Sequence, residues 1–191
     1  MKHILTLAGM MAAVIIASSC STSHTLVDDQ GNPLSKEQLK QYQATLDSLT
    51  VAAAHNAVES HDFVVEADKL VFRDGSAAYV TPSTNFISLI GNKAVVQVSP
   101  FRSFGGPNGV GGITLNGTTS TIKITHDKRG NTDLSMIVTG PVMSATVTMT
   151  LYKGTDRATV RISSNFRNSK VTLEGRVMPS EMSTVVKGNS I

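Results

Sequence analysis

A glycine-rich segment, residues 100–112, holds the side chains best placed to contact a ligand. Two interpretations are open: a plain connection between strands, which is the commoner outcome for long loops, or a rim that touches a ligand. Gly109-Val110-Gly111-Gly112 is not followed by Lys and Ser/Thr and leads into an apparent strand, which excludes a P-loop and a dinucleotide fingerprint. In the second interpretation the contact residues are Phe101, Arg102, Phe104 and Asn108.

Catalytic and metal-binding patterns are not found in the sequence. Its histidines beyond the first segment, His24, His55, His61 and His126, form no HExxH motif, and there is no Gly-x-Ser-x-Gly elbow. We therefore predict no catalytic residue, no metal site, no cofactor and no enzymatic activity. The alternative is a hydrolase assembled from distant residues, which requires His61 or His126 close to two carboxylates.

Basic residues cluster near the end of the chain. Arg157 and Arg161 share one face of a predicted strand, with Lys170 and Arg176 close to the next strand. They form either a basic stripe toward anionic headgroups or a solvated face balanced by Glu174, and we favour the second. The chain has 17 Lys and Arg against 14 Asp and Glu, a net charge of +3, which does not indicate nucleic-acid binding.

The first residues have the layout of a signal peptide, with Lys2 before an apolar run over residues 4–17. Ala17-Ser18-Ser19-Cys20 resembles a bacterial lipobox, although leucine is usual where Ala17 stands. Cys20 is the only cysteine, so no disulfide is available. We predict a signal peptide over residues 1–19, removed before Cys20, whose thiol carries palmitate or a similar acyl chain.

Residues 20–33 are polar and are predicted to form a flexible tether between the lipid and the domain. No acidic cluster follows Cys20 directly, which favours the periplasmic side of the outer membrane over the cell surface. The expected partners are the membrane, through acylated Cys20, and a small hydrophobic ligand or an envelope protein. The expected function is a membrane-anchored, non-enzymatic binding or interaction module.

A helix is predicted from Ser35 to about Ser60. Gln38 follows Ser35 at the spacing of a capping box. One helical stripe is apolar, and we expect it to pack on the sheet of the same domain. Its members are Leu39, Tyr42, Leu46, Leu49, Ala53 and Ala57.

From Phe63 onward the apolar residues alternate with polar ones, which is typical of strands with one buried face. Turn signals recur at hairpin spacing, among them Gly91-Asn92. The prediction is an all-β fold with one N-terminal helix: an antiparallel meander that forms a barrel or a sandwich, with the helix packed against it. The domain is expected over residues 34–178, followed by a loose tail over residues 179–191.

Four features of the sequence form a pattern that is typical of a known family. They are the helix leading into Ser60 to Asp68, the strand at Asn85-Phe86 with Gly91-Asn92-Lys93-Ala94-Val95-Val96, the loop leading to Gly112-Ile113, and the strand pair from Ser163-Ser164 to Glu174-Gly175. In these features the chain resembles the domain-of-unknown-function family 4251, small lipoproteins of gut Gram-negative bacteria. The resemblance implies the domain boundaries and an envelope location, and it supplies no catalytic residues.

Overall fold

The computed structural model describes residues 26–27, 30–99, 112–165 and 170–188. The chain divides into two compact units, Met1–Asp47 and Ser48–Ile191. In the first unit, an isolated bridge joins Val27 to Pro33 just before the helix begins. The second unit carries the β-sheet.

Helix α1 (Lys36–Glu59) starts at the predicted capping box. The Ser35 N–H donates to Gln38 Oε1 at 2.9 Å, and the Gln38 N–H donates to Ser35 Oγ at 3.2 Å. These bonds satisfy two of the backbone donors that a helix start leaves without partners. After the helix, His61 adopts the left-handed conformation, φ 57°, that often ends helices. Both ends of the helix therefore lie where the sequence predicts them.

The last turns of α1 pack against the sheet, through Ala54, Ala57 and Val58 in the hydrophobic core. The predicted apolar stripe contributes little to this packing, since the side chains of four of its members are between 39% and 61% exposed. Ala54 lies about 140° around the helix from the exposed Leu49, at about 100° per residue. The helix is thus packed as predicted, but mainly through a different face. The exposed members are Leu39, Tyr42, Leu46 and Leu49.

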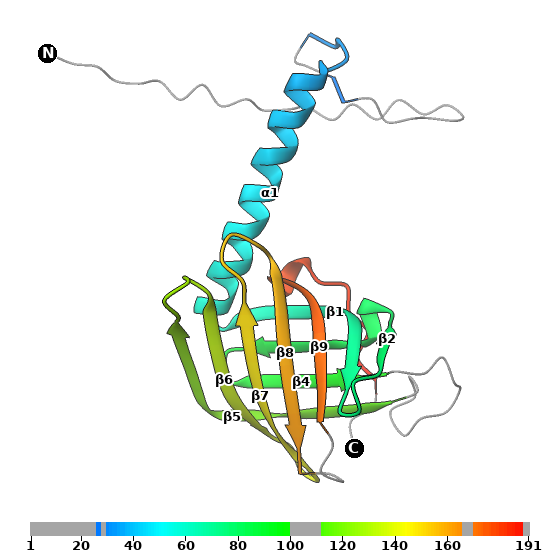
Figure 1. Cartoon of the computed structure of the whole chain (residues 1–191), viewed down its shortest axis with the longest axis vertical. Coiled ribbons are helices and arrows are strands. Elements are labelled where there is room, and N and C mark those ends of the chain that lie inside the picture. Colours follow the sequence, from blue (N-terminus) through cyan, green and yellow to red (C-terminus); the bar gives the residue numbers. More distant parts are fainter. Residues whose placement is uncertain (1–25, 28–29, 100–111, 166–169, 189–191) are drawn as a thin grey trace, which may run out of the picture. The chain divides into compact units, whose positions relative to one another are not determined.

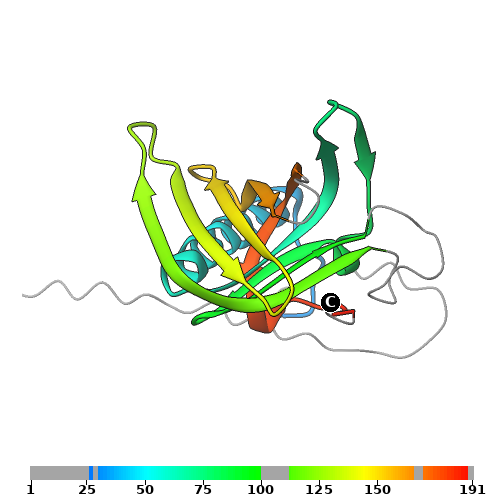
Figure 2. The same cartoon turned by 90° about the horizontal axis from the view of Figure 1, so that it is seen from below.

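The strands run antiparallel to their neighbours along the chain, as a meander. The last strand pairs with the first, so eight strands close into a barrel (Figures 1 and 2). This settles the choice between barrel and sandwich. The elements are β1 (Asp62–Phe72), β2 (Ala77–Tyr79), η1 (Pro82–Thr84), β3 (Phe86–Ile90), β4 (Lys93–Val98), β5 (Ile113–His126), β6 (Thr132–Thr139), β7 (Ser144–Leu151), β8 (Arg157–Ser164), β9 (Lys170–Pro179) and η2 (Ser180–Met182).

Strand β1 is long enough to serve three partners. One edge pairs with β9 from Phe63 to Phe72, and the other edge pairs first with β3 and then with β2. Strand β2 is therefore an addition to the barrel rather than one of its eight members. Figure 2 shows the sheet curling so that β5 and β6 lie on one side and β1 and β2 on the other.

The core lies inside the barrel and follows the alternation seen in the sequence. In β7, Ala145, Val147, Met149 and Leu151 are at most 3% exposed. The threonines between them face outward, where a β-branched polar side chain suits a strand. The predicted hairpin is also present, since Ile90 pairs with Lys93 across a two-residue loop whose Gly91 has φ 61°.

Strands β1 and β3 are buried on both faces around Val64 and Phe86, where the C-terminal tail is bonded to the outer side. Val64 and Phe86 are 3% and 1% exposed, although neither belongs to the core cluster inside the barrel. The tail is bonded to this face: Ser183 Oγ donates to Glu66 Oε1 at 2.7 Å, and Ser180 Oγ donates to Asp62. The expectation of a loose tail therefore fails for its described part, which ends at residue 188.

Candidate functional site

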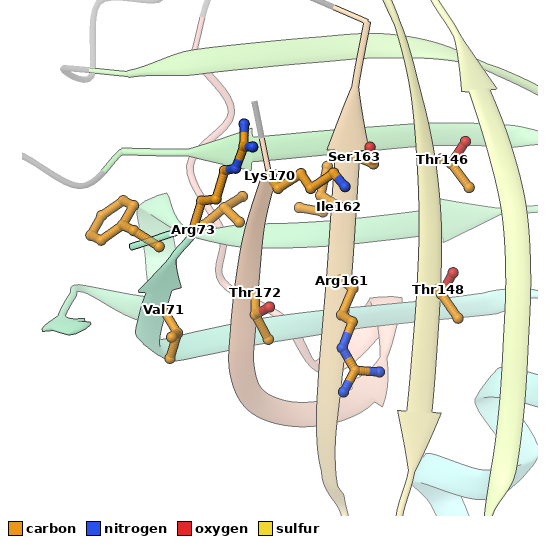
Figure 3. Close-up of a pocket in the computed structure, with 11 residues that line it drawn as sticks. Val71, Arg73, Thr146, Thr148, Arg161, Ile162, Ser163, Lys170 and Thr172 are labelled. Carbon is orange, nitrogen blue, oxygen red and sulfur yellow. The ribbon is translucent and has the colours of Figure 1, made fainter. Parts of the chain in front are cut away.

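A groove of about 300 Å³ lies on the outer face of the barrel, where strands β7, β8, β9 and the end of β1 run side by side (Figure 3). Its residues form two rows across the strands. In the first row Thr148 pairs with Arg161, Arg161 with Thr172, and Thr172 with Val71. The groove is lined by Val71, Phe72, Arg73, Thr146, Thr148, Arg161, Ile162, Ser163, Lys170, Val171 and Thr172.

The second row lies one step closer to the ends of β1 and β8. Thr146 pairs with Ser163, and Ser163 pairs with Lys170. Arg73 directly follows Phe72, which pairs with Val171. Lys170 and Arg73 therefore lie at the same end of the groove, as Figure 3 shows.

The groove lining contains three cations and no carboxylate. Arg73, Arg161 and Lys170 are exposed, and none of them forms an ion pair with another described residue. The nearest acidic neighbour in sequence is Asp74. Hydrogen bonds from the Ser76 hydroxyl and N–H lower the pKa of Asp74 and hold its carboxylate in its own turn.

Two carboxylates on this outer face, Glu174 and Asp133, already have partners. Next to the groove, Lys69 Nζ lies 3.1 Å from Glu174 Oε2, so the carboxylate one row from Arg161 already has a cation. In the same row as Glu174, Asp133 Oδ1 accepts a 2.6 Å hydrogen bond from the Thr150 hydroxyl. Neither of these two carboxylates is therefore bonded to a cation of the groove.

Two further ion pairs lie toward the other end of the strands. Arg157 binds Asp68 through two bonds of 2.6 and 3.2 Å, and the bond to this carboxylate raises the pKa of Arg157. Arg176 Nη1 lies 2.9 Å from Asp156 Oδ2. On strands β8 and β9, the cations without an acidic partner among the described residues are therefore Arg161 and Lys170, both in the groove.

Of the four basic residues that the sequence places near one another, two have acidic partners and two do not. Arg157 and Arg176 are balanced as we favoured, but by Asp68 and Asp156, while Glu174 binds Lys69. Arg161 and Lys170 have no acidic partner among the described residues. Sequence reasoning missed Arg73, Thr146 and Thr148, because only the register of the strands brings them to Arg161. The alternation of threonines in β7 was the one available signal.

The other predicted contact residues lie outside the described part of the chain. This holds for Cys20 and for Phe101, Arg102, Phe104 and Asn108. The two residues at the base of their loop are described. Ser99 N–H donates to Asn85 Oδ1 at 2.7 Å, and a Cβ on Gly112 would lie 1.9 Å from the Val98 carbonyl oxygen. The two ends of the loop are therefore held close together.

Of the two histidines named for a hydrolase, His126 has one carboxylate within ion-pair distance among the described residues and His61 has none. His126 Nε2 lies 3.5 Å from Glu59 Oε1, and both side chains are about half exposed. Its Nδ1 contacts the Thr132 hydroxyl at 3.3 Å, so no second carboxylate faces this ring within the described residues. No group of three or more His, Cys, Asp or Glu side chains in the described ranges is arranged to hold a metal ion. The described helix also lacks the apolar length needed to cross a membrane.

Comparison with known proteins gives a family but no activity. A family model described as "Domain of unknown function (DUF4251)" matches residues 46–177, a range that includes the groove. A crystal structure of a DUF4251 family protein from Bacteroides eggerthii DSM 20697, at 1.95 Å resolution, is 39% identical in sequence. That match covers 73% of this chain and 93% of the other, with a TM-score of 0.63. No curated protein matches the chain. The chain therefore belongs to the DUF4251 family, as the resemblance in its sequence predicted.

Proposed function

We propose that this protein is a lipoprotein of the bacterial cell envelope that binds a small ligand or an envelope partner and catalyses no reaction. The anchoring rests on one observation: the only cysteine, Cys20, stands directly after the apolar run over residues 4–17 and two small residues. A lone cysteine at that place has few other uses. One acyl chain anchors a protein only marginally, so two or three chains are needed for permanent attachment.

The site of attachment is testable by substitution. Cys20→Ala should abolish labelling by a radioactive fatty acid and either release the protein from the membrane fraction or leave the precursor uncut. The reason is that the thiol and the new amine of Cys20 are the acylated groups. The measurement is fractionation of cells with a blot for the protein. Ser23→Ala, a change three residues further on, should fractionate like the wild type. A Cys20→Ala protein that stays in the membrane and is labelled would refute the anchor.

The location follows from the residues after Cys20. Because no acidic cluster stands there, we propose that the protein faces the periplasm from the outer membrane. Protease added to intact cells should then leave it uncut, and should cut it once the outer membrane is permeabilised. Cleavage on intact cells would place the domain on the cell surface instead.

The binding role is supported by the groove on β7, β8, β9 and β1. The apolar residues inside the barrel are explained by burial, and three ion pairs account for Lys69, Arg157 and Arg176 on its outer side. Neither accounts for Arg73, Arg161 and Lys170, which line one groove without acidic partners in the described chain. Because apolar side chains of the strands pack together inside the barrel, a ligand bound on the outer surface agrees better with the structure than a hydrophobic molecule held inside the barrel.

The experiment for this role is native mass spectrometry of the protein purified from its own host. A reproducible extra mass bound to the folded chain, lost on denaturation, is the expected result, because a module that works by binding retains its ligand. Absence of any bound molecule or protein, together with turnover of a supplied ester or glycoside, would favour the hydrolase alternative and overturn the proposal.

A further inference from the structure

We propose that the groove binds a phosphate monoester, carried either by a small soluble molecule or by the headgroup of a phospholipid. This inference rests on the proposed binding function and names its ligand class. The starting observation is the placement of charge, since Arg73, Arg161 and Lys170 line one groove without a carboxylate. A bound anion would supply the negative charge that the described residues do not.

The three cations occupy neighbouring positions on the outer face. Arg161 pairs with Thr172, and Lys170 is two residues before Thr172 on β9, so the two cations are diagonal neighbours on one face. Diagonal neighbours across antiparallel strands have backbones about 7–8 Å apart, a gap that long side chains readily span. Arg73 reaches the same end of the groove from β1. In Figure 3 the Arg73 and Lys170 side chains lie at one end of the groove and the Arg161 guanidinium points toward the other end, so binding one anion with all three cations requires the long Arg161 side chain to turn.

The chemistry of the lining favours phosphate over a single carboxylate. A phosphate monoester has a charge of about −1.5 to −2 at pH 7 and three acceptor oxygens. Arginine binds such oxygens through two parallel N–H bonds, and lysine binds them as a point charge. Hydroxyl groups from Ser163 and Thr172 lie beside the cations and can donate to the remaining oxygens. A carboxylate has one charge and two oxygens, and would leave two of the three cations without a partner.

The groove also has room and surface for the rest of a small ligand. Its volume of about 300 Å³ is at the lower end for ligand pockets, which suits a headgroup or a small phosphate ester. Val71 is half-buried, pairs with Thr172 on the same face and offers apolar surface to the carbon part of the molecule. The ligand class is thus an organic phosphate rather than a bare apolar molecule.

The test uses the full chain in micelles of a neutral detergent. Glycerol 3-phosphate is titrated by calorimetry, and in a second arm phosphatidic acid, which carries the same phosphate ester on a lipid, is mixed into the micelles. Saturable binding of glycerol 3-phosphate would assign a soluble ester. Binding of phosphatidic acid alone would assign a lipid headgroup. Micelles with phosphatidylcholine should give no signal, because its phosphate is a diester paired with a cation.

Three variants distinguish binding in the groove from a general effect of positive charge. Arg161→Gln should weaken binding about tenfold or more, because a hydrogen bond to a charged group is lost. Arg129→Gln removes the same charge from an exposed turn residue outside the groove, and should bind like the wild type. Arg161→Lys should restore part of the affinity, since it keeps the charge but loses the two-pronged bond.

Three results would overturn the phosphate assignment. These are no saturable binding in either arm, equal weakening by Arg161→Gln and Arg129→Gln, or binding by phosphatidylcholine micelles that matches phosphatidic acid. Such a failure is distinct from failure of the proposed function. If native mass spectrometry finds a neutral ligand while both phosphate arms are silent, the protein is a binding module with a different ligand class.

Discussion

Replacing Gly175 with alanine should destabilise the barrel by about 3 kcal/mol or more, or prevent it from folding. A Cβ at this position would lie 2.1 Å from the Glu66 carbonyl oxygen and 2.7 Å from the Ala67 Cα. Both are backbone atoms, so no side chain can move aside to make room. Gly175 belongs to β9 and lies opposite Ala67 in the seam that closes the barrel onto β1. Denaturant unfolding followed by circular dichroism would give the loss directly.

Gly154→Ala is the matched control for this prediction. Gly154 also has unusual backbone geometry, φ 69°, but a Cβ there would meet nothing within 4 Å. Only the conformational cost remains, which is about 1–2 kcal/mol for a left-handed residue. If the two variants unfold at the same denaturant concentration, the close approach of β9 to β1 does not matter for stability. A larger loss for Gly175→Ala attributes the difference to contact at the seam.

The seam also shows what the sequence cannot reveal about this fold. Apolar residues alternate in every strand of a barrel and of a sandwich, so the pattern in β7 predicts a strand but not its closure. Closure depends on pairs such as Phe63 with Pro179, whose separation along the chain leaves no local signal. A bulge at Asp68 shifts the register between Ala67 and Lys69, and no turn residue announces it. Strands and hairpins were therefore predictable, and their final pairing was not.

The candidate site was predictable to a smaller extent, for a related reason. Arg161 and Lys170 stand out in the sequence as basic residues near one another. Whether each one has an acidic partner depends on which residues lie beside it on other strands. Asp68 reaches Arg157 across a separation of 89 residues, which composition alone cannot show. The sequence thus locates the charges, while the strand register decides which of them are free to bind.

The C-terminal tail is a third case, because Gln97 binds it through the backbone groups of the tail. Its polar sequence resembles a loose end, yet the tail is bound by Gln97, a side chain that is 0% exposed. Gln97 Nε2 donates to the Val186 carbonyl at 2.9 Å, and Gln97 Oε1 accepts from the Gly188 N–H at 2.8 Å. Backbone groups are present in every sequence, so they give no pattern to read. A buried glutamine in a predicted strand was the only hint.

Gln97→Leu should therefore destabilise the protein by about 3 kcal/mol and release the tail. Besides its bonds to the tail, the Gln97 amide donates to the Thr84 carbonyl at 3.1 Å and accepts from the Thr114 hydroxyl at 2.9 Å. Leucine is similar in size but satisfies none of these groups, and each buried group without a partner costs about 1–3 kcal/mol. The loss is measured by denaturant unfolding, and release of the tail by faster amide exchange at Val186 and Gly188.

The same substitution at an exposed glutamine provides the control. Gln43 lies on helix α1 and bonds the Asp47 carboxylate at 3.0 Å in full contact with solvent, so Gln43→Leu should change stability by no more than about 0.5 kcal/mol. Removing residues 184–191 from the wild type should reproduce much of the Gln97→Leu loss, because it also strips Gln97 of its tail partners and uncovers Phe86. In the truncated protein Gln97→Leu should then cost clearly less than in the full chain. Equal costs in both backgrounds would show that Gln97 stabilises the barrel without holding the tail.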